Sequence, residues 1–157
     1  MRRFKSAQGR KLTSLEVYDI CCTIANCVVA GGVRRSATIS LSDLEDSKMR
    51  HAKDGQFWVE DPQRALSNNP VVYEARPDAA SFAEEWTALM RSGSGERGIV
   101  NRQALRAKAA HSLRRDEGRD FGVNPCGETI LRPKSFCNLT EVVVRPDDTV
   151  MTLADKV

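Results

Sequence analysis

The sequence lacks the long apolar segment that a membrane span requires. No apolar run approaches the roughly 20 residues needed to cross a bilayer, and charged residues make up 29% of the chain. The first residues, 1–11, are basic, but no apolar stretch follows them, and the next segment carries Glu16 and Asp19. We therefore expect no signal peptide and no membrane span, and a cytoplasmic protein.

Histidines and paired cysteines are also scarce. The two histidines, His51 and His111, are isolated, and a lone histidine is more often a surface or hydrogen-bonded residue than a ligand. The five cysteines are odd in number, which argues against a disulfide framework in a protein without a secretory signal. Cys22 and Cys27 are not followed by a second Cys or His pair at a distance typical of zinc sites. The sequence therefore predicts no metal site.

The charge balance does not favour a nucleic-acid binder. The net charge is only +3, and acidic residues lie between the basic ones. A nucleic-acid-binding domain usually carries a more basic stripe. Local clusters such as Arg34-Arg35 fit a phosphorylated small molecule equally well, because a guanidinium matches phosphate oxygens.

The first recognisable element is a capped helix. Thr13 and Glu16 have the spacing of a capping box, in which each side chain bonds to the other residue's amide. We expect the helix to reach Ala30, to stop at Gly31-Gly32, and to be buried except for a polar stripe. The stripe comprises Glu16, Asp19, Thr23 and Asn26, and we interpret the three thiols of this helix as packing residues: Cys21, Cys22 and Cys27.

Helical and strand patterns then alternate along the chain. The spacing predicts strands at 37–41 and 71–73, a buried strand at 98–101, helices at 78–91 and 102–113, and a helix that begins near 150. A short helix is expected after the capping residues 42–46. This alternation is typical of a parallel α/β arrangement. At 157 residues, the chain is long enough for one domain or part of a larger one.

The segment with the clearest chemical character is Val123-Asn124-Pro125-Cys126-Gly127-Glu128. Pro125 and Gly127 exclude a regular helix around Cys126 and favour an exposed loop. Asn124 and Glu128 each lie two residues from the thiol, so an amide, a thiol and a carboxylate could converge on one ligand. A turn in which Asn124 and Glu128 merely cap neighbouring amides is equally compatible with this spacing.

The motif resembles the active-site loop of the adenosylcobalamin-dependent (class II) ribonucleotide reductases. Asn-Pro-Cys-Gly-Glu is followed by Cys137 in Phe-Cys-Asn-Leu, at the distance that the family shows. The segment from Gly31 to Ala37 resembles the family's loop between the allosteric specificity site and the substrate base. The resemblance extends from about Leu12 to Val144, and it implies part of a ten-stranded α/β barrel with a central finger loop.

The resemblance also implies roles for individual residues. Cys126 would become a thiyl radical that takes the 3′-hydrogen of the ribose, while Glu128 would accept the 3′-hydroxyl proton. Asn124 would fix the ribose hydroxyls, and Cys137 would be one of two reducing cysteines. Substrate contacts would come from Pro125, Gly127, Asn68 and Asn69, and contacts that select the base from Gly31, Gly32, Val33, Arg34, Arg35, Ser36 and Ala37. No Gly-Lys-Ser/Thr ending follows the glycines, which excludes a P-loop.

The implied reaction is radical-based reduction of ribonucleotides, with a weak preference for triphosphates, a deoxynucleotide effector and a thioredoxin-like reductant. We expect the whole chain, 1–157, to be a partial catalytic barrel, because the regions that bind most of the adenosylcobalamin and carry the other reducing cysteine are absent. A complementary reductase polypeptide would then supply them. The alternatives are a reductase of another class, and an inactive remnant or a regulatory or assembly subunit of a complete reductase. A thiol-dependent hydrolase is discounted, because no histidine follows Cys126 to act as its base.

Overall fold

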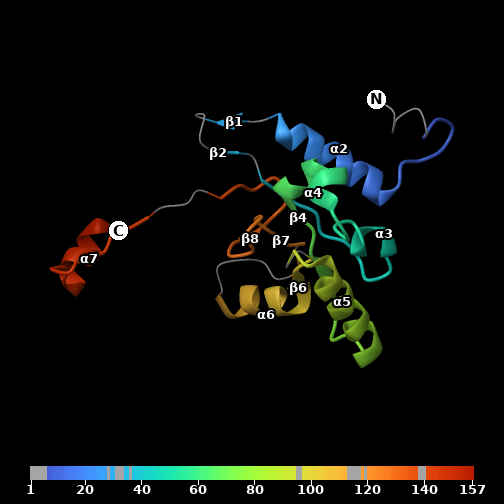
Figure 1. Ribbon diagram of the computed structural model, residues 1–157. Coiled ribbons are helices and arrows are strands. Elements are labelled where there is room, and N and C mark those ends of the chain that lie inside the picture. Colours follow the sequence, from blue (N-terminus) through green and yellow to red (C-terminus); the bar gives the residue numbers. More distant parts are fainter. Residues whose placement is uncertain are drawn as a thin grey trace.

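The computed structural model describes residues 7–27, 29–30, 34–35, 37–94, 97–112, 118, 120–137 and 141–157 (Figure 1). The helices are α2 (Ser14–Asn26), α3 (Ser47–Arg50), α4 (Phe57–Glu60), the 3-10 helix η1 (Pro62–Leu66), α5 (Ala79–Ser92), α6 (Arg102–Ser112) and α7 (Val150–Lys156). The strands are β1 (Val29–Ala30), β2 (Arg34–Arg35), β3 (Thr38–Ile39), β4 (Ser67–Asn68), β5 (Val71–Tyr73), β6 (Ile99–Asn101), β7 (Gly122–Val123) and β8 (Ile130–Leu131).

Helix α2 begins as predicted and ends earlier. The Thr13 side chain accepts the Glu16 amide, and the Glu16 carboxylate accepts the Thr13 amide, so the predicted capping box is confirmed. The prediction that the helix reaches Ala30 was wrong. Its last helical residue is Asn26, and β1 instead pairs antiparallel with β2. Valine at position 29 favours a strand, and this pairing satisfies the backbone groups that a longer helix would have used.

The buried face of α2 also differs from the prediction. Tyr18, Cys22 and Ala25 are buried together with Asp19, whereas Val17 and Ile24 are exposed. Asp19 can lie inside because η1 provides an ionic partner for it, as described below. Cys21 and Cys27 are exposed, so the interpretation of the three thiols as packing residues holds for Cys22 and was wrong for the other two.

Among the described residues, the strands form four two-stranded sheets. β3 pairs with β4 and β5 with β6, both in parallel, whereas β1–β2 and β7–β8 are antiparallel. The parallel pairs confirm the α/β class, while a ten-stranded barrel goes beyond what this chain shows. The strand at 98–101 was predicted to be buried, and this was wrong: Ile99 and Asn101 are exposed, because β6 has only β5 beside it in the described part of the chain.

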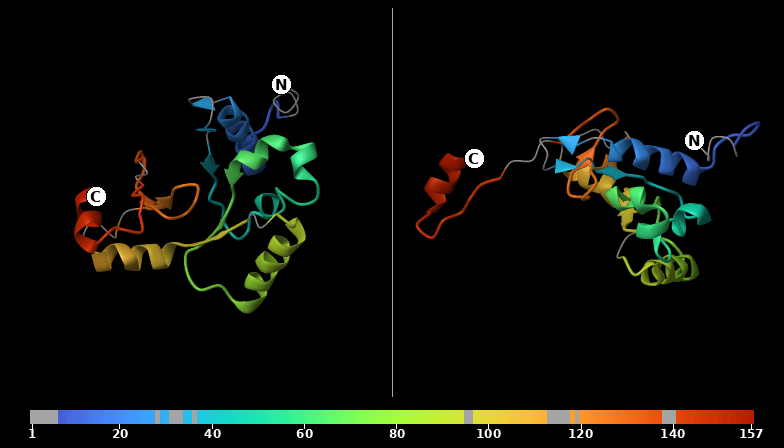
Figure 2. Two further views of the ribbon diagram at one scale, coloured as in Figure 1. Left: turned by 60° about the vertical axis from the view of Figure 1, so that its left-hand side comes forward. Right: turned by 45° about the horizontal axis from the view of Figure 1, so that its top comes forward.

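The helices after β5 have the predicted positions. Asp78 caps α5 by accepting the amides of Ala80 and Ser81, and Gly93 ends the helix in the left-handed conformation that glycine tolerates. Figure 1 and the right view of Figure 2 show α7 apart from the other helices, at the end of an extended segment. No described helix has the length and apolar character needed to cross a membrane.

Buried ion pairs hold the small core together. Arg64 of η1 donates from Nε and Nη2 to the two carboxylate oxygens of Asp19, at 2.6 and 2.8 Å, and thereby ties η1 to α2. Arg97 and Arg50 both donate to the carboxylate of Glu85 on α5. An apolar cluster of Tyr18, Cys22, Met49 and Ala52 adjoins the first pair, since Arg64 also donates to the Ala52 carbonyl. Met49 of α3 and Lys53 also hold the segment that contains β4, because the Met49 carbonyl accepts from Asn69 and the Lys53 ammonium donates to the Ser67 carbonyl.

Candidate active site

The Cys126 motif forms the tip of the hairpin made by β7 and β8. Gly122 pairs with Leu131 and Val123 with Ile130, and the amide of Asn124 donates to the Thr129 carbonyl at 3.1 Å. Residues 124–129 are therefore the connecting loop. The motif is a loop, as predicted, and within it Cys126, Gly127 and Glu128 are exposed.

The first four residues of this loop form a β-turn. The Gly127 amide donates to the Asn124 carbonyl at 2.9 Å, which closes the turn. Asn first, Pro second and Gly fourth are the residues that a type I turn prefers. Gly127 has a φ of +83°, a value that side chains disfavour. Cys126 occupies the third position, where its thiol is exposed.

Asn124 and Glu128 lie together beside this turn. Asn124 Nδ2 donates to Glu128 Oε1 at 2.5 Å, and Asn124 Oδ1 accepts the Thr129 amide at 2.9 Å. Because the Thr129 amide can only donate, it orients the Asn124 side chain with its NH2 group toward the carboxylate. Asn124 is almost completely buried, whereas Glu128 is exposed. A fixed amide therefore holds an accessible carboxylate two residues from the exposed thiol.

The two asparagines predicted to bind substrate have different surroundings. Asn68 Nδ2 donates to the carbonyl of Pro125 at 3.1 Å, so β4 contacts the turn directly. Asn69 is 1% exposed, and its Nδ2 donates to the Met49 carbonyl. The structure therefore brings Asn68 to the candidate site and places Asn69 in the core. Sequence spacing gave no sign of the Asn68–Pro125 contact, because the two residues are 57 positions apart.

Cys137 follows the hairpin after a second turn. The Ser135 amide donates to the Arg132 carbonyl at 3.0 Å, and Lys134 has a φ of +62°. The Cys137 side chain is partly buried, and all five cysteines of the chain are free thiols. Cys137 therefore lies in the segment that follows β8, and its thiol forms no disulfide.

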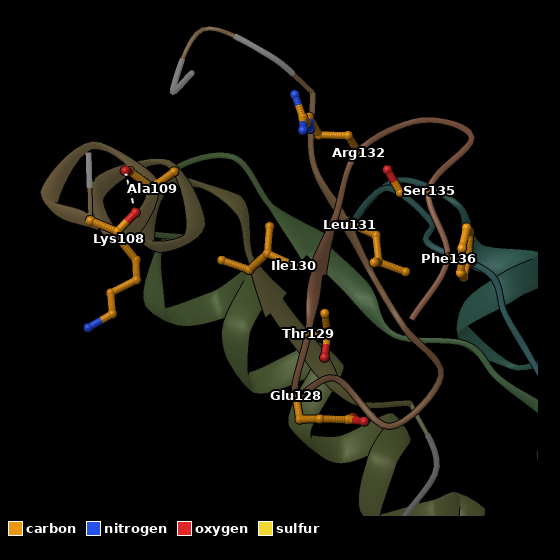
Figure 3. Close-up of a pocket in the computed structure, with 10 residues that line it drawn as sticks. Lys108, Ala109, Glu128, Thr129, Ile130, Leu131, Arg132, Ser135 and Phe136 are labelled. Atoms are coloured by element: carbon orange, nitrogen blue, oxygen red, sulfur yellow. Dashed lines mark hydrogen bonds between the residues drawn. The ribbon is translucent and has the colours of Figure 1, made fainter. Parts of the chain in front are cut away.

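A cleft of about 830 Å³ lies between α6 and the hairpin (Figure 3). Figure 3 shows Glu128 and Arg132 at opposite ends of the hairpin segment that lines it. Ser112 Oγ donates to the Ala109 carbonyl at 2.8 Å on the helical side. The lining residues are Lys108, Ala109, Ser112, Glu128, Thr129, Ile130, Leu131, Arg132, Ser135 and Phe136. The candidate acid–base residue therefore faces a cavity within the size range of small-molecule sites.

The predicted base-selecting segment is described only in part. Gly31, Gly32, Val33 and Ser36 lie outside the described residues, whereas Arg34 and Arg35 form β2 and Ala37 is exposed. β3 begins directly after Ala37 and pairs with β4, with Ile39 opposite Asn68. The segment is thus connected to the active-site turn through two paired strands.

Sequence comparison gives this geometry a family context. The chain is 37% identical over 137 residues to the adenosylcobalamin-dependent ribonucleoside-triphosphate reductase of Lacticaseibacillus paracasei. The matched region covers 85% of this chain. The enzymes of the same name from Levilactobacillus brevis and Lactobacillus leichmannii are 36% and 34% identical, over 87% and 85% of the chain. This chain matches a fragment of a class II ribonucleotide reductase.

The family resemblance expected from the sequence is therefore confirmed. The chain spans about 18% of the length of the reductases that it matches. No protein-family model matches the chain, and no solved structure matches it significantly.

The cleft beside Glu128 does not fit the cofactor that the reductases' name implies. Pockets for drug-sized ligands already reach about 1,000 Å³, and a cobalamin with its adenosyl group is larger than such a ligand. The cleft beside Glu128 is open and has about 830 Å³. Within the described part of the chain, no group of three or more His, Cys, Asp or Glu side chains could hold a metal ion. These residues therefore do not form a cobalamin pocket by themselves.

Proposed function

We propose that this chain is the catalytic-centre segment of an enzyme that reduces ribonucleotides to 2′-deoxyribonucleotides. The observation that supports it is the hairpin turn, which presents the Cys126 thiol two residues from a carboxylate that Asn124 orients. The names of the similar reductases support the same reaction and a triphosphate substrate. A ribonucleotide substrate also agrees with a cytoplasmic location.

In the proposed reaction, Cys126 acts as a thiyl radical. It takes the 3′-hydrogen of the ribose, since a thiol has a weak S–H bond and the transfer is reversible. Glu128 accepts the 3′-hydroxyl proton, and the 2′-hydroxyl takes a proton from one of the two reducing thiols and leaves as water. Glu128 later returns its proton to the 3′-oxygen. Asn124 fixes Glu128 through the 2.5 Å bond to its carboxylate. The oxidant that generates the radical is supplied by other parts of the enzyme.

Cys137 acts in the second half of the proposed reaction. Together with a second cysteine outside this chain, it provides two electrons and a proton to the substrate radical and becomes part of a disulfide. Cys126 then returns the hydrogen to C3′, so that one ribonucleotide and one dithiol give one deoxyribonucleotide, one disulfide and one water. A thioredoxin-like protein reduces the disulfide, and a deoxynucleotide effector controls base selection through the segment from Gly31 to Ala37.

A second candidate function follows from the coverage of the relatives. Because the chain spans about 18% of their length, it could instead serve as an inactive remnant or an assembly subunit beside a complete reductase. The two functions differ in one observable: a catalytic segment turns over within the assembled reductase, and its turnover depends on Cys126.

The proposal is tested by distinguishing the roles of Cys126 and Cys137 in the assembled reductase that contains this segment. Cys126→Ser is expected to abolish 3′-hydrogen removal and every later step on the substrate, because an alcohol O–H bond is too strong to yield the radical easily. Cys137→Ser is expected to allow 3′-hydrogen removal and water loss, after which the unreduced intermediate decomposes and releases the free base. The measurement is base release from a labelled nucleotide.

Cys21→Ser provides the matched control, because Cys21 is also an exposed thiol but lies on α2. It is expected to leave deoxynucleotide formation unchanged. Base release by both loop variants, or normal turnover by Cys126→Ser, would show that the assigned roles are wrong. An assembled reductase that is equally active with and without Cys126 would favour the assembly subunit.

A further inference from the structure

The turn that carries Cys126 receives a hydrogen bond from a distant strand. Asn68 Nδ2 donates to the Pro125 carbonyl at 3.1 Å, and that carbonyl belongs to the peptide unit that contains the Cys126 nitrogen. Among the described residues, no other hydrogen bond joins residues 124–129 to a segment outside the hairpin. The orientation of this peptide therefore depends on where Asn68 lies.

Asn68 is itself held on several sides. Its carbonyl accepts the Ser40 amide at 2.8 Å, and its backbone pairs with Ile39 in the parallel β3–β4 ladder. On one side, the buried Lys53 ammonium donates to the carbonyl of Ser67. On the other side, Asn69 is anchored to the Met49 carbonyl. The amide of Asn68 thus extends from a rigid strand, as a group that positions another residue must.

We infer that Asn68 is a positioning residue, which holds the Cys126 turn in place by donating to the Pro125 carbonyl. It acts on the peptide before Cys126 and not on the substrate. The catalytic consequence rests on the proposed function, because only an active Cys126 makes the orientation of this peptide matter for turnover. The structural statement stands independently and can be measured without substrate.

The first test is amide hydrogen exchange in the 157-residue chain and in the assembled reductase. Asn68→Asp keeps the shape of the side chain but replaces the NH2 donor by an acceptor, which is repelled by the Pro125 carbonyl. Since one hydrogen bond contributes about a factor of ten at most to such an opening equilibrium, the Gly127 and Thr129 amides are expected to exchange about 3- to 10-fold faster. The Val71 amide, which donates to Gly98 in another sheet, is the internal reference and is expected to be unchanged.

Two further variants calibrate this result. Asn26→Asp makes the same chemical change at an exposed asparagine that ends α2, and it is expected to leave exchange at Gly127 unchanged. Asn68→Gln retains an amide donor and is expected to recover part of the protection. If amide exchange became equally faster at Gly127 and at Val71, Asn68 would contribute only to the general stability of the chain. That result would overturn the inference. Unchanged exchange at Gly127 would overturn it as well.

The second test is kinetic and uses the assembled reductase. A positioning role predicts that Asn68→Asp lowers kcat about tenfold while KM changes less than twofold, because the substrate itself is not contacted. A rise in KM with normal exchange at Gly127 would instead show direct substrate binding, and would overturn the positioning role. If the wild-type assembly reduces no ribonucleotide, the proposed function fails, and the exchange measurement still decides whether Asn68 holds the turn.

Discussion

Individual buried charges are positions at which this chain is sensitive to substitution. Glu85 is 2% exposed and accepts hydrogen bonds from Arg97 and Arg50, while Arg97 also donates to Ser42. Removing one partner of such a group leaves the others charged, buried and unpaired, which costs more than the pair itself contributes. Arg97 further adopts a φ of +90°, so its backbone is held in an uncommon conformation. The surrounding contacts must compensate for that conformation.

The adjacent glutamates of α5 allow a direct test of this argument. Glu85→Gln is expected to lower the free energy of unfolding by about 3–5 kcal/mol, because Arg97 and Arg50 lose their shared carboxylate. Glu84→Gln is the control: its side chain is 67% exposed and lies 3.4 Å from Arg50, and such surface pairs contribute at most about 1 kcal/mol. Urea unfolding of the three proteins measures the difference. Equal effects of the two substitutions would contradict the assigned role of Glu85.

The same carboxylate predicts a pH dependence. Burial raises the pKa of Glu85, but the hydrogen bonds from Arg97 and Arg50 outweigh burial, and the pKa is lowered overall. A lowered folded-state pKa gives stability that is fully present above the unfolded value of about 4.3. That stability is lost as the pH falls through the folded pKa. The wild-type chain should therefore lose more stability below about pH 4 than Glu85→Gln does.

At the scale of single residues, contacts between residues close in sequence could be predicted, and contacts between residues far apart in sequence could not. The capping box of Thr13 and Glu16 was predictable, because three positions of spacing determine the geometry. Asp19 was expected on a polar surface stripe, since nothing local announces that Arg64 will pair with it 45 positions later. The bond from Asn68 to Pro125 was unpredictable for the same reason.

At the scale of elements, the β7–β8 hairpin is the feature that organises the site. Its tip has the residue order of a type I turn, so the exposed position of Cys126 could be predicted from Pro125 and Gly127. Element types were predicted well where the periodicity was long, as in α5. The end of α2 was not, because the apolar spacing continues to Ala30 while Val29 and Ala30 pair with β2 instead of extending the helix.

The antiparallel pair of β1 and β2 carries the next prediction. If the segment from Gly31 to Ala37 selects the substrate base, Arg34→Ala and Arg35→Ala should change the preference among bases more than the rate on the best substrate. A fivefold or larger change in relative kcat/KM corresponds to about 1 kcal/mol of discrimination. Rates on all four ribonucleotides, measured in the assembled reductase, provide the check. Arg91→Ala, an exposed arginine at the end of α5, is the control.

An equal loss on all four substrates would count against this role. It would favour a general contribution of the two arginines to substrate phosphate binding or to the pairing of β1 with β2. β3 follows directly and pairs with the strand that holds Asn68. A double variant that combines Arg35→Ala with Asn68→Asp would therefore show whether base selection and turn position are coupled or additive.

At the scale of the whole molecule, the described residues leave strand edges unpaired and apolar side chains exposed. Its sheets are two-stranded, and isolated pairs of this size are marginally stable. Residues 142–144 are three consecutive valines in an extended, exposed segment beside α7. Unpaired edges and exposed apolar strands favour association with further strands. These features agree with a chain that spans about 18% of the reductases it matches.

The short span of the match leads to a prediction about activity. The purified 157-residue chain, supplied with adenosylcobalamin and dithiothreitol, is expected to form no deoxynucleotide. Its cleft beside Glu128 is too small and open to hold a cobalamin, and the proposed mechanism requires a second reducing cysteine beside Cys137. Addition of the complementary reductase polypeptide should restore turnover, and Cys126→Ser in this chain should abolish the restored activity. Deoxynucleotide formation by the chain alone would refute the proposal that the active site is divided between this chain and another polypeptide. Restored turnover that survives Cys126→Ser would show that the partner is a complete enzyme. This chain would then assist the partner without catalysing the reaction.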